Sequence, residues 1–142
     1  MFNEIIDDSE FLFRGVVNVN WDFENDRPSS ATFKDSLGVS VDRDGGRNQT
    51  ECITELLLKK NFIAICKVLT YDVREIGAIV KYLPIINYNI FHSEIHDSIK
   101  GQKNPIKLGI NLQLFIKSNL FKTAISPNPH SRLRGLSPLF DL

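Results

Sequence analysis

A short polar stretch early in the chain carries residue types that bind anions. Arg27, Ser29, Ser30 and Lys34 place two cations and two hydroxyls within eight positions. These groups can make charge-assisted hydrogen bonds to a phosphate or a carboxylate. The stretch is too polar for a core, and binding groups concentrate on surface loops. It therefore predicts a ligand-binding loop, the alternative being that the serines cap a turn and Arg27 pairs with a nearby aspartate.

A histidine-containing segment in the middle of the chain has the groups needed for proton transfer. It contains two imidazoles and two carboxylates: His92, Glu94, His96 and Asp97. Such groups also bind zinc, iron or manganese, but the HExxH motif is absent because Ser93 occupies the glutamate position. We expect no metal site. The segment is either a solvated connector or an acid/base centre in which His92 moves a proton, a role that histidine often has in proteins.

Composition limits the classes of function. The chain has 142 residues and a formal net charge of zero. Residues 1–50 hold ten acids and five bases, whereas residues 51–142 hold seven acids and twelve bases. The simpler interpretation is that the two halves neutralise each other on folding; the other is that the basic half meets nucleic acid or an acidic partner. A pI near 6.8 argues against a dedicated DNA-binding domain, and the glycine-rich phosphate-binding motifs are absent.

Cysteine usage and the first residues indicate the compartment. Cys52 and Cys66 lie in apolar runs with no CxxC pair, so we expect buried, reduced thiols. The first residues lack the basic region followed by an apolar region that marks a signal peptide. No run approaches the roughly eighteen apolar residues of a membrane span. We therefore expect a cytoplasmic protein that does not contact a membrane.

The first half of the chain predicts two strands and a helix. Residues 11–19, which include Arg14, and residues 38–41 have the composition of strands. Between them, residues 20–34 are expected to form a long loop fixed by Trp21 and Phe23. Asn48 and Glu51 form a capping box for a helix over residues 49–60. The inward face of this helix is expected to carry three apolar side chains: Ile53, Leu56 and Leu57.

The second half predicts further strands and a closing helix. Strands are expected at residues 62–69 and 78–82, with a helical turn at 73–76 between them, and residues 85–91 form an edge strand or an extended loop. An amphipathic helix over residues 108–120 is expected to cover the sheet. These elements predict one α+β domain, residues 1–122, with a small mixed sheet packed by two to three helices. The tail, residues 123–142, is rich in proline and is expected to be docked or disordered.

Two resemblances bear on function. Arg14, the serine pair Ser29 and Ser30, and Glu94 follow the order arginine, serine, glutamate, which resembles a class of ADP-ribosyltransferases. That resemblance implies that arginine and serine hold NAD while glutamate orients the ribose, although the usual Ser-Thr-Ser strand and glutamate-rich loop are missing. The RPSS-x-x-F element at residues 27–33, the SVDR element at residues 40–43 and the later histidine also resemble small uncharacterised bacterial proteins. This second resemblance spans most of residues 12–120 and implies no activity.

These observations lead to one expected cleft. Its residues are anion ligands and proton carriers, namely Arg14, Arg27, Ser29, Ser30, Lys34 and Arg43 for the ligand and His92, Glu94 and Asp42 for catalysis. The leading hypothesis is a phosphate-bearing ligand, a nucleotide or nucleic acid, with hydrolase or transferase chemistry. The alternative is a non-enzymatic module that docks a protein partner within a larger bacterial assembly. No particular cofactor is indicated.

Overall fold

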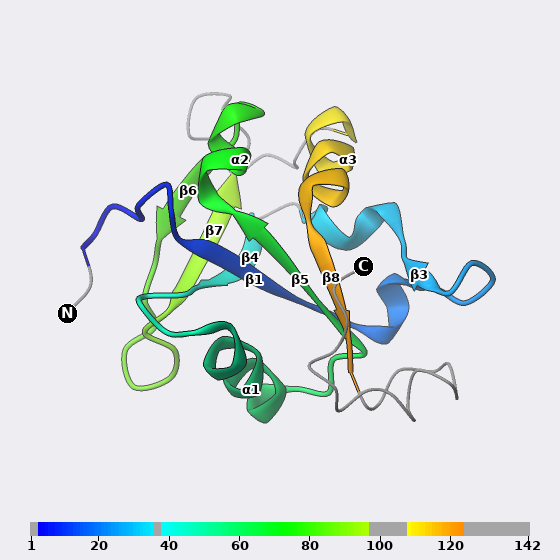
Figure 1. Cartoon of the computed structure of the whole chain (residues 1–142), viewed down its shortest axis with the longest axis horizontal. Helices are drawn as coiled ribbons and strands as arrows, with labels where there is room; N and C mark the ends of the chain where they lie inside the picture. Colours follow the sequence, from blue (N-terminus) through cyan, green and yellow to red (C-terminus); the bar gives the residue numbers. More distant parts are fainter. Residues whose placement is uncertain (1–2, 36–37, 97–107, 124–142) are drawn as a thin grey trace.

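Segments rich in β-branched and aromatic residues form one sheet in the computed structural model, which describes residues 3–35, 38–96 and 108–123. Within these residues the sheet has six strands in the order β6-β7-β4-β1-β5-β8, and all neighbouring strands pair antiparallel (Figure 1). The strands are β1 (Phe11–Val16), β4 (Val39–Arg43), β5 (Ala64–Leu69), β6 (Ile79–Tyr82), β7 (His92–His96) and β8 (Asn119–Lys122). A separate hairpin joins β2 (Trp21–Asp22) to β3 (Arg27–Pro28).

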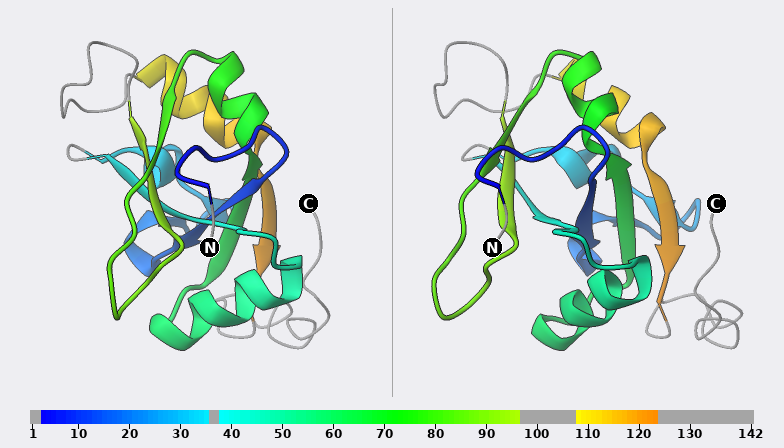
Figure 2. Two further views of the ribbon diagram at one scale, coloured as in Figure 1. Left: turned by 90° about the vertical axis from the view of Figure 1, so that its left-hand side faces the viewer. Right: turned by 60° about the vertical axis from the view of Figure 1, so that its left-hand side comes forward.

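Helices cover both faces of the sheet. The described helices are α1 (Gln49–Lys59), α2 (Thr70–Glu75) and α3 (Leu108–Lys117), with short 3-10 turns at η1 (Asn18–Asn20) and η2 (Ser30–Phe33). α1 lies on one side of the sheet, and α2 and α3 lie on the other (Figures 1 and 2). The predicted capping box begins α1: Asn48 Oδ1 accepts from the Glu51 N–H at 2.9 Å, and Glu51 Oε1 accepts from the Asn48 N–H at 3.1 Å.

Alternation along the strands divides the core in two. One face of β1 contributes Leu12 and Val16 to a cluster that also contains Val73 of α2 and Leu114 of α3. The opposite face contributes Phe13 to a smaller cluster with α1. The other buried members of that smaller cluster are Cys52, Ile53, Leu56, Ile65 and Phe121. The core is thus built from residues at a spacing of two in the strands and three to four in the helix.

α1 covers only part of its face of the sheet. The strand residues in the cluster beneath it come from β1, β5 and β8. Phe13 lies opposite Asp42 on β4, which in turn lies opposite His92 on β7, so these three side chains share that face. The face therefore continues beyond α1 onto β4 and β7, where polar groups replace the apolar core.

Acidic and basic halves of the chain meet in space. The central strands β1 and β4 come from the acidic half, and β5, β7, β6 and β8 from the basic half flank them on both sides. Ion pairs join the halves: Asp8 with Arg74 at 2.5 Å, Asp26 with Lys122 at 2.9 Å, and Asp42 with Lys59 at 3.6 Å. Mutual neutralisation, the simpler interpretation of the charge asymmetry, accounts for these carboxylates.

Several local expectations need correction. Residues 20–34 are not one loop, because they contain the β2–β3 hairpin and both 3-10 turns. Trp21 is buried as expected, but Phe23 is 59% exposed. In α1, Cys52 takes the inward position expected for Leu57, which is exposed. The closing helix ends at Lys117, and residues 119–122 form the strand β8 instead.

Other expectations are confirmed or lie outside the described residues. The chain forms one α+β domain, and both cysteines are free and buried. Among the described residues no helix combines the length and apolar character needed to cross a bilayer. The cytoplasmic location stays a prediction. The expected tail falls almost wholly on residues 124–142, outside the described part of the chain.

Candidate functional site

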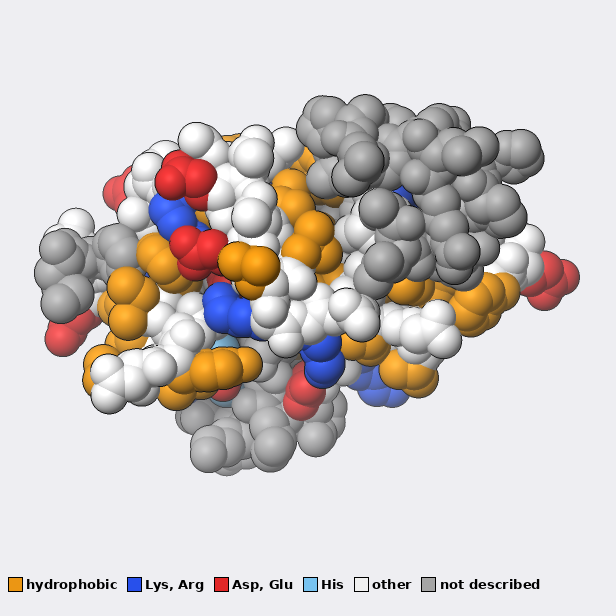
Figure 3. Space-filling view, turned by 90° about the horizontal axis from the view of Figure 1, so that it is seen from below, with side chains coloured by type: hydrophobic (Ala, Val, Ile, Leu, Met, Phe, Trp, Pro, Cys, Tyr) orange, Lys and Arg blue, Asp and Glu red, His pale blue; other side chains and the backbone are white. Residues whose placement is uncertain are grey.

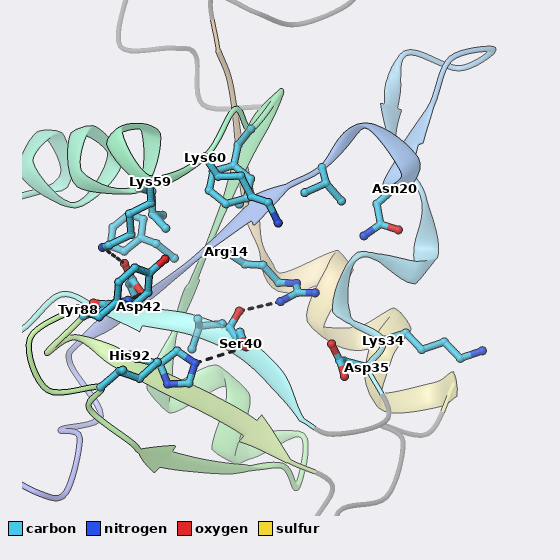
Figure 4. A pocket seen from close by; sticks show the side chains of 18 residues that line it. Arg14, Asn20, Lys34, Asp35, Ser40, Asp42, Lys59, Lys60, Tyr88 and His92 are labelled. Carbon is cyan, nitrogen blue, oxygen red and sulfur yellow. Dashed lines mark hydrogen bonds and ion pairs between the residues drawn. The ribbon is translucent and has the colours of Figure 1, made fainter.

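A cleft of about 620 Å³ lies beside the C-terminal end of α1 (Figure 4). The sheet provides its floor, α1 one wall, and the loop between β6 and β7, residues 83–91, another. The polar and charged lining residues are Arg14, Asn20, Lys34, Asp35, Ser40, Asp42, Lys59, Lys60, Tyr88, Asn89 and His92. The cleft therefore gathers side chains that are up to 78 positions apart in the sequence.

Arg14 lies where β1 and β4 separate. The two strands pair only at Leu12 with Arg43 and at Phe13 with Asp42. Beyond that point the Arg14 guanidinium donates from NH1 to the Ser40 carbonyl at 2.7 Å and from Nε to the Thr32 carbonyl. Burial lowers the pKa of Arg14, and the nearby Asp35 opposes this effect. The guanidinium thus lies at the cleft and donates these two hydrogen bonds to neutral carbonyl oxygens.

His92 is held in a defined orientation at the floor of the cleft. Its Nδ1 lies 2.9 Å from the Leu83 carbonyl oxygen, which only accepts hydrogen bonds, so Nδ1 carries a proton and donates it. In the neutral ring Nε2 is then an acceptor. Nε2 faces the Ser40 hydroxyl at 3.5 Å (Figure 4). It also lies 3.8 Å from Oε2 of Glu94. This arrangement suits a group that takes up a proton.

Asp42 is a buried carboxylate at the same end of the cleft. The residue is 3% exposed, and its Oδ1 accepts from Nδ2 of Asn89 at 2.8 Å. Its Oδ2 has no hydrogen-bond partner among the described residues, and Nζ of Lys59 lies 3.6 Å away. Asn89 also receives the Phe91 N–H on Oδ1 at 3.1 Å. The carboxylate therefore anchors the loop before β7 through one oxygen, while the other lacks a donor.

The charge of the cleft is positive. Four cationic side chains line it, from Arg14, Lys34, Lys59 and Lys60, against two carboxylates. Lys60 follows α1 and extends toward Arg14, whereas Lys34 lies at the far end and extends outward (Figure 4). Among the described residues, neither Lys34 nor Lys60 forms a salt bridge. Low-dielectric walls around such groups focus a field that attracts anions.

Some of the residues expected at one cleft lie there together. These are Arg14, Lys34, Asp42 and His92. The others do not line it: Arg27, Ser29, Ser30, Arg43 and Glu94. Glu94 is adjacent, because its Oε1 accepts from Nε2 of His96 at 2.9 Å and its Oε2 approaches His92.

The remaining residues occupy structural positions. Arg27 is exposed on the β2–β3 hairpin, opposite Asp22. Ser29 precedes η2 without a side-chain capping bond, and its carbonyl accepts from the Thr32 hydroxyl at 2.7 Å. Arg43 is 2% exposed and forms a two-pronged pair with Glu10, at 2.9 Å from Nε and 2.5 Å from NH2. These contacts fix elements that surround the cleft.

Sequence reasoning missed Ser40, Lys59, Lys60 and Tyr88. The lysines end a predicted helix, where cations are common because they offset the helix dipole, so their types gave no signal of binding. Tyr88 lies in a stretch in which asparagines alternate with apolar groups. A signal was available for Ser40, because residues 40, 42, 92, 94 and 96 share one face once their segments are assigned as strands.

The described residues contain no group of three or more histidine, cysteine, aspartate or glutamate side chains that could hold a metal ion. Comparisons of the chain with protein-family models, with curated proteins and with solved structures give no match. The geometry of the cleft is therefore the basis on which its function is inferred.

Proposed function

We propose that the cleft beside α1 binds a phosphate-bearing anion. The observation that carries this proposal is the excess of four cations over two carboxylates in one concave site. Asp42 neutralises Lys59 in part. Arg14 donates hydrogen bonds to two carbonyl oxygens, and Lys60 has no carboxylate partner among the described residues. A phosphate placed between Arg14 and Lys60 satisfies both cations.

A hydrolysis or transfer reaction on the bound group belongs to this proposal. His92 is the proton carrier, because its Nδ1 is occupied by the Leu83 carbonyl and its Nε2 is left to accept. The Ser40 hydroxyl, 3.5 Å from Nε2, supplies the nearest protein nucleophile. Catalytic hydrogen bonds are often this long before substrate arrives. His92→Gln is expected to leave binding of phosphate in place and to abolish any turnover.

Thermal unfolding in the presence of inorganic phosphate and pyrophosphate tests binding. A ligand that binds only the folded state stabilises it by about 2.7 kcal/mol at a hundredfold excess over its dissociation constant. We expect the midpoint to rise with either anion in wild type and the rise to shrink in Lys60→Ala. Lys117→Ala, which removes an exposed lysine at the end of α3, is the matched control.

Chloride at the same ionic strength separates a bound anion from general screening. The proposal fails if phosphate and pyrophosphate raise the midpoint no more than chloride does. It also fails if Lys60→Ala and Lys117→Ala reduce the rise equally, because the cleft is then not the place of binding.

Docking of a protein partner is the second candidate function, and an apolar loop favours it. Leu83, Ile85, Ile86, Tyr88 and Ile90 of the β6–β7 loop are all exposed. Figure 3, viewed from the side of α1 and this loop, shows apolar surface interspersed with charged groups. Exposed apolar patches of this kind mark interaction sites. The phosphate titration decides between the two functions, since a docking loop does not respond to small anions.

A further inference from the structure

We infer that the ligand of the cleft is a nucleoside 5′-phosphate, with its phosphate between Arg14 and Lys60 and its nucleoside between Tyr88 and Asp42. This inference rests on the proposed anion binding and adds the chemical class of the ligand. Three observations carry it: the size of the cleft, an aromatic and apolar end, and an unsatisfied buried acceptor.

The cleft has the size of a small-molecule site. Its volume of about 620 Å³ falls within the roughly 300 to 1,000 Å³ typical of ligand pockets. Nucleic acid needs instead an extended basic track along the surface. The chain has a formal net charge of zero, and the described cations of the site line one concave cleft. These features favour a mononucleotide over a polymer.

One end of the cleft is suited to a planar base. Tyr88 lines the cleft and is 67% exposed, so its ring is accessible to a ligand. Leu56, Phe62 and Ile85 add apolar lining. Bases stack on aromatic side chains regardless of their sequence, because every base has a π-face. A bare phosphate gains nothing from these groups.

The same end holds a carboxylate oxygen that needs a donor. Asn89 occupies Oδ1 of Asp42 and thereby fixes the carboxylate, while Oδ2 has no hydrogen-bond partner among the described residues. The large majority of buried side-chain polar atoms in native proteins have a hydrogen-bond partner. Lys59 lies 3.6 Å away, beyond hydrogen-bonding distance. A ribose hydroxyl or an amine of a base supplies the missing donor, which a fully ionised phosphate lacks.

The two ends lie in the order that a nucleotide requires. Tyr88, Asp42 and Lys59 are together at one side of the close-up view, and the Arg14 guanidinium lies farther along the cleft beside Lys60 (Figure 4). Nζ of Lys59 lies 3.6 Å from Oδ2 of Asp42, at the end of the cleft away from the phosphate position. A nucleoside donor that binds Oδ2 takes the place of the Lys59 ammonium group beside this oxygen.

Calorimetric titration with the 5′-monophosphates of adenosine, guanosine, cytidine and uridine tests the inference, alongside ribose 5-phosphate and inorganic phosphate. We expect at least one nucleotide to bind tenfold or more tightly than both ribose 5-phosphate and inorganic phosphate. Tyr88→Ala and Asp42→Asn should each lower the affinity for that nucleotide at least fivefold without lowering the affinity for inorganic phosphate. Lys60→Ala should lower the affinity for the nucleotide and for inorganic phosphate.

Two features keep this test decisive. Tyr71→Ala removes another exposed tyrosine, on α2 and outside the cleft lining, and should leave every affinity unchanged. Because Asp42 is buried, the unfolding midpoint of Asp42→Asn is measured first, and Tyr88→Ala tests the site independently if that variant unfolds.

The other outcomes separate the inference from the proposed function. If phosphate binds and no nucleotide binds more tightly, anion binding stands and the nucleotide inference is overturned. If an oligonucleotide of twelve thymidines binds more tightly than every mononucleotide, the ligand is nucleic acid, which again overturns the inference. If neither phosphate nor nucleotides bind, both proposals fail.

Discussion

The NH1 group of Arg14 donates a 2.7 Å hydrogen bond to the main-chain oxygen of Ser40, at the point where β1 and β4 cease to pair. The side chain thus replaces the strand ladder across a gap in the centre of the sheet. Its Nε donates to the Thr32 carbonyl of η2, so one guanidinium joins three elements. The gap that it bridges forms part of the cleft.

Replacing Arg14 with methionine should destabilise the domain by roughly 2–3 kcal/mol, because it leaves the Thr32 and Ser40 carbonyls without their donors. Urea unfolding followed by circular dichroism measures the change. Arg27→Met, at an exposed position on β3, should stay within about 0.5 kcal/mol of wild type. Equal stabilities of the two variants would mean that the guanidinium is dispensable to the sheet.

Gly15→Ala should destabilise by about 1–3 kcal/mol through overpacking. A methyl group at this position would lie 2.3 Å from Cδ1 of Phe62, whose ring packs against the glycine. In a double-mutant cycle Phe62→Leu makes room, so the double variant should lose less stability than the two single losses combined. Strict additivity in urea unfolding would show that the ring already has space to move.

The pair formed by Glu10 and Arg43 should make the free energy of unfolding fall as the pH becomes acidic. Burial raises the pKa of Glu10, but hydrogen bonds from Arg43 and the Gly45 N–H outweigh it and hold this pKa below its ordinary value. Stability from the pair is therefore complete above the ordinary pKa of about 4.3 and is lost as the pH falls through the lowered value.

Glu10→Gln should cost at least about 2 kcal/mol at pH 7, because Arg43 then stays buried without its charge partner. It should also flatten the fall in stability between about pH 5 and pH 3. The exposed pair of Asp8 and Arg74 is the comparison, and Asp8→Asn should cost less than about 1 kcal/mol. Urea midpoints measured at several pH values check both variants, and parallel acid profiles of wild type and Glu10→Gln would contradict the assignment.

The two buried cysteines should make the free energy of unfolding fall as the pH rises into the alkaline range. Burial raises the pKa of Cys52 to about 11 and that of Cys66 to about 12. The unfolded thiols ionise near pH 8.5, so the unfolded chain releases protons first and stability falls as the pH rises from about 9 toward these values. The fall amounts to about 2 kcal/mol per thiol by pH 10.

The double variant Cys52→Ala, Cys66→Ala isolates this contribution. It should be less stable than wild type at pH 7, because both side chains lie in the core. The difference in free energy of unfolding between wild type and the variant should become smaller by pH 10, because the variant has no thiols to ionise. A constant difference in urea midpoints between the two pH values would rule out thiol ionisation as the cause.

Local sequence signals predicted much of the fold. The capping box at Asn48, the β-branched run ending at Leu69 and the glycine after α2 each act within a few residues, so the sequence shows them directly. The strand β8 was not predicted, because Leu120 continues an apolar pattern that is compatible with a helix. Pairing with β5, in which Leu120 lies opposite Cys66, makes this segment a strand. Pairing between distant segments is what a local pattern does not contain.

The site was predicted less well than the fold, for a related reason. Arg14 and Arg43 look equivalent in the sequence, yet Arg14 lines the cleft and Arg43 is buried against Glu10. The prediction of His92 and Asp42 at one place is matched because the two are opposite each other on paired strands. Register decides which charges meet, and register was not available from one sequence.

The central position of β1 and β4 has a consequence for how the protein is made. These two strands pair with each other, but their outer neighbours in the sheet, β5 and β7, come later in the chain and are synthesised after them. Closure of the sheet must therefore wait for segments some fifty positions downstream, and such nonlocal pairing slows folding. Until β5 and β7 have been made, the outer edges of β1 and β4 are unpaired. A nascent chain in this state is prone to aggregation, so this is when a chaperone protects it most.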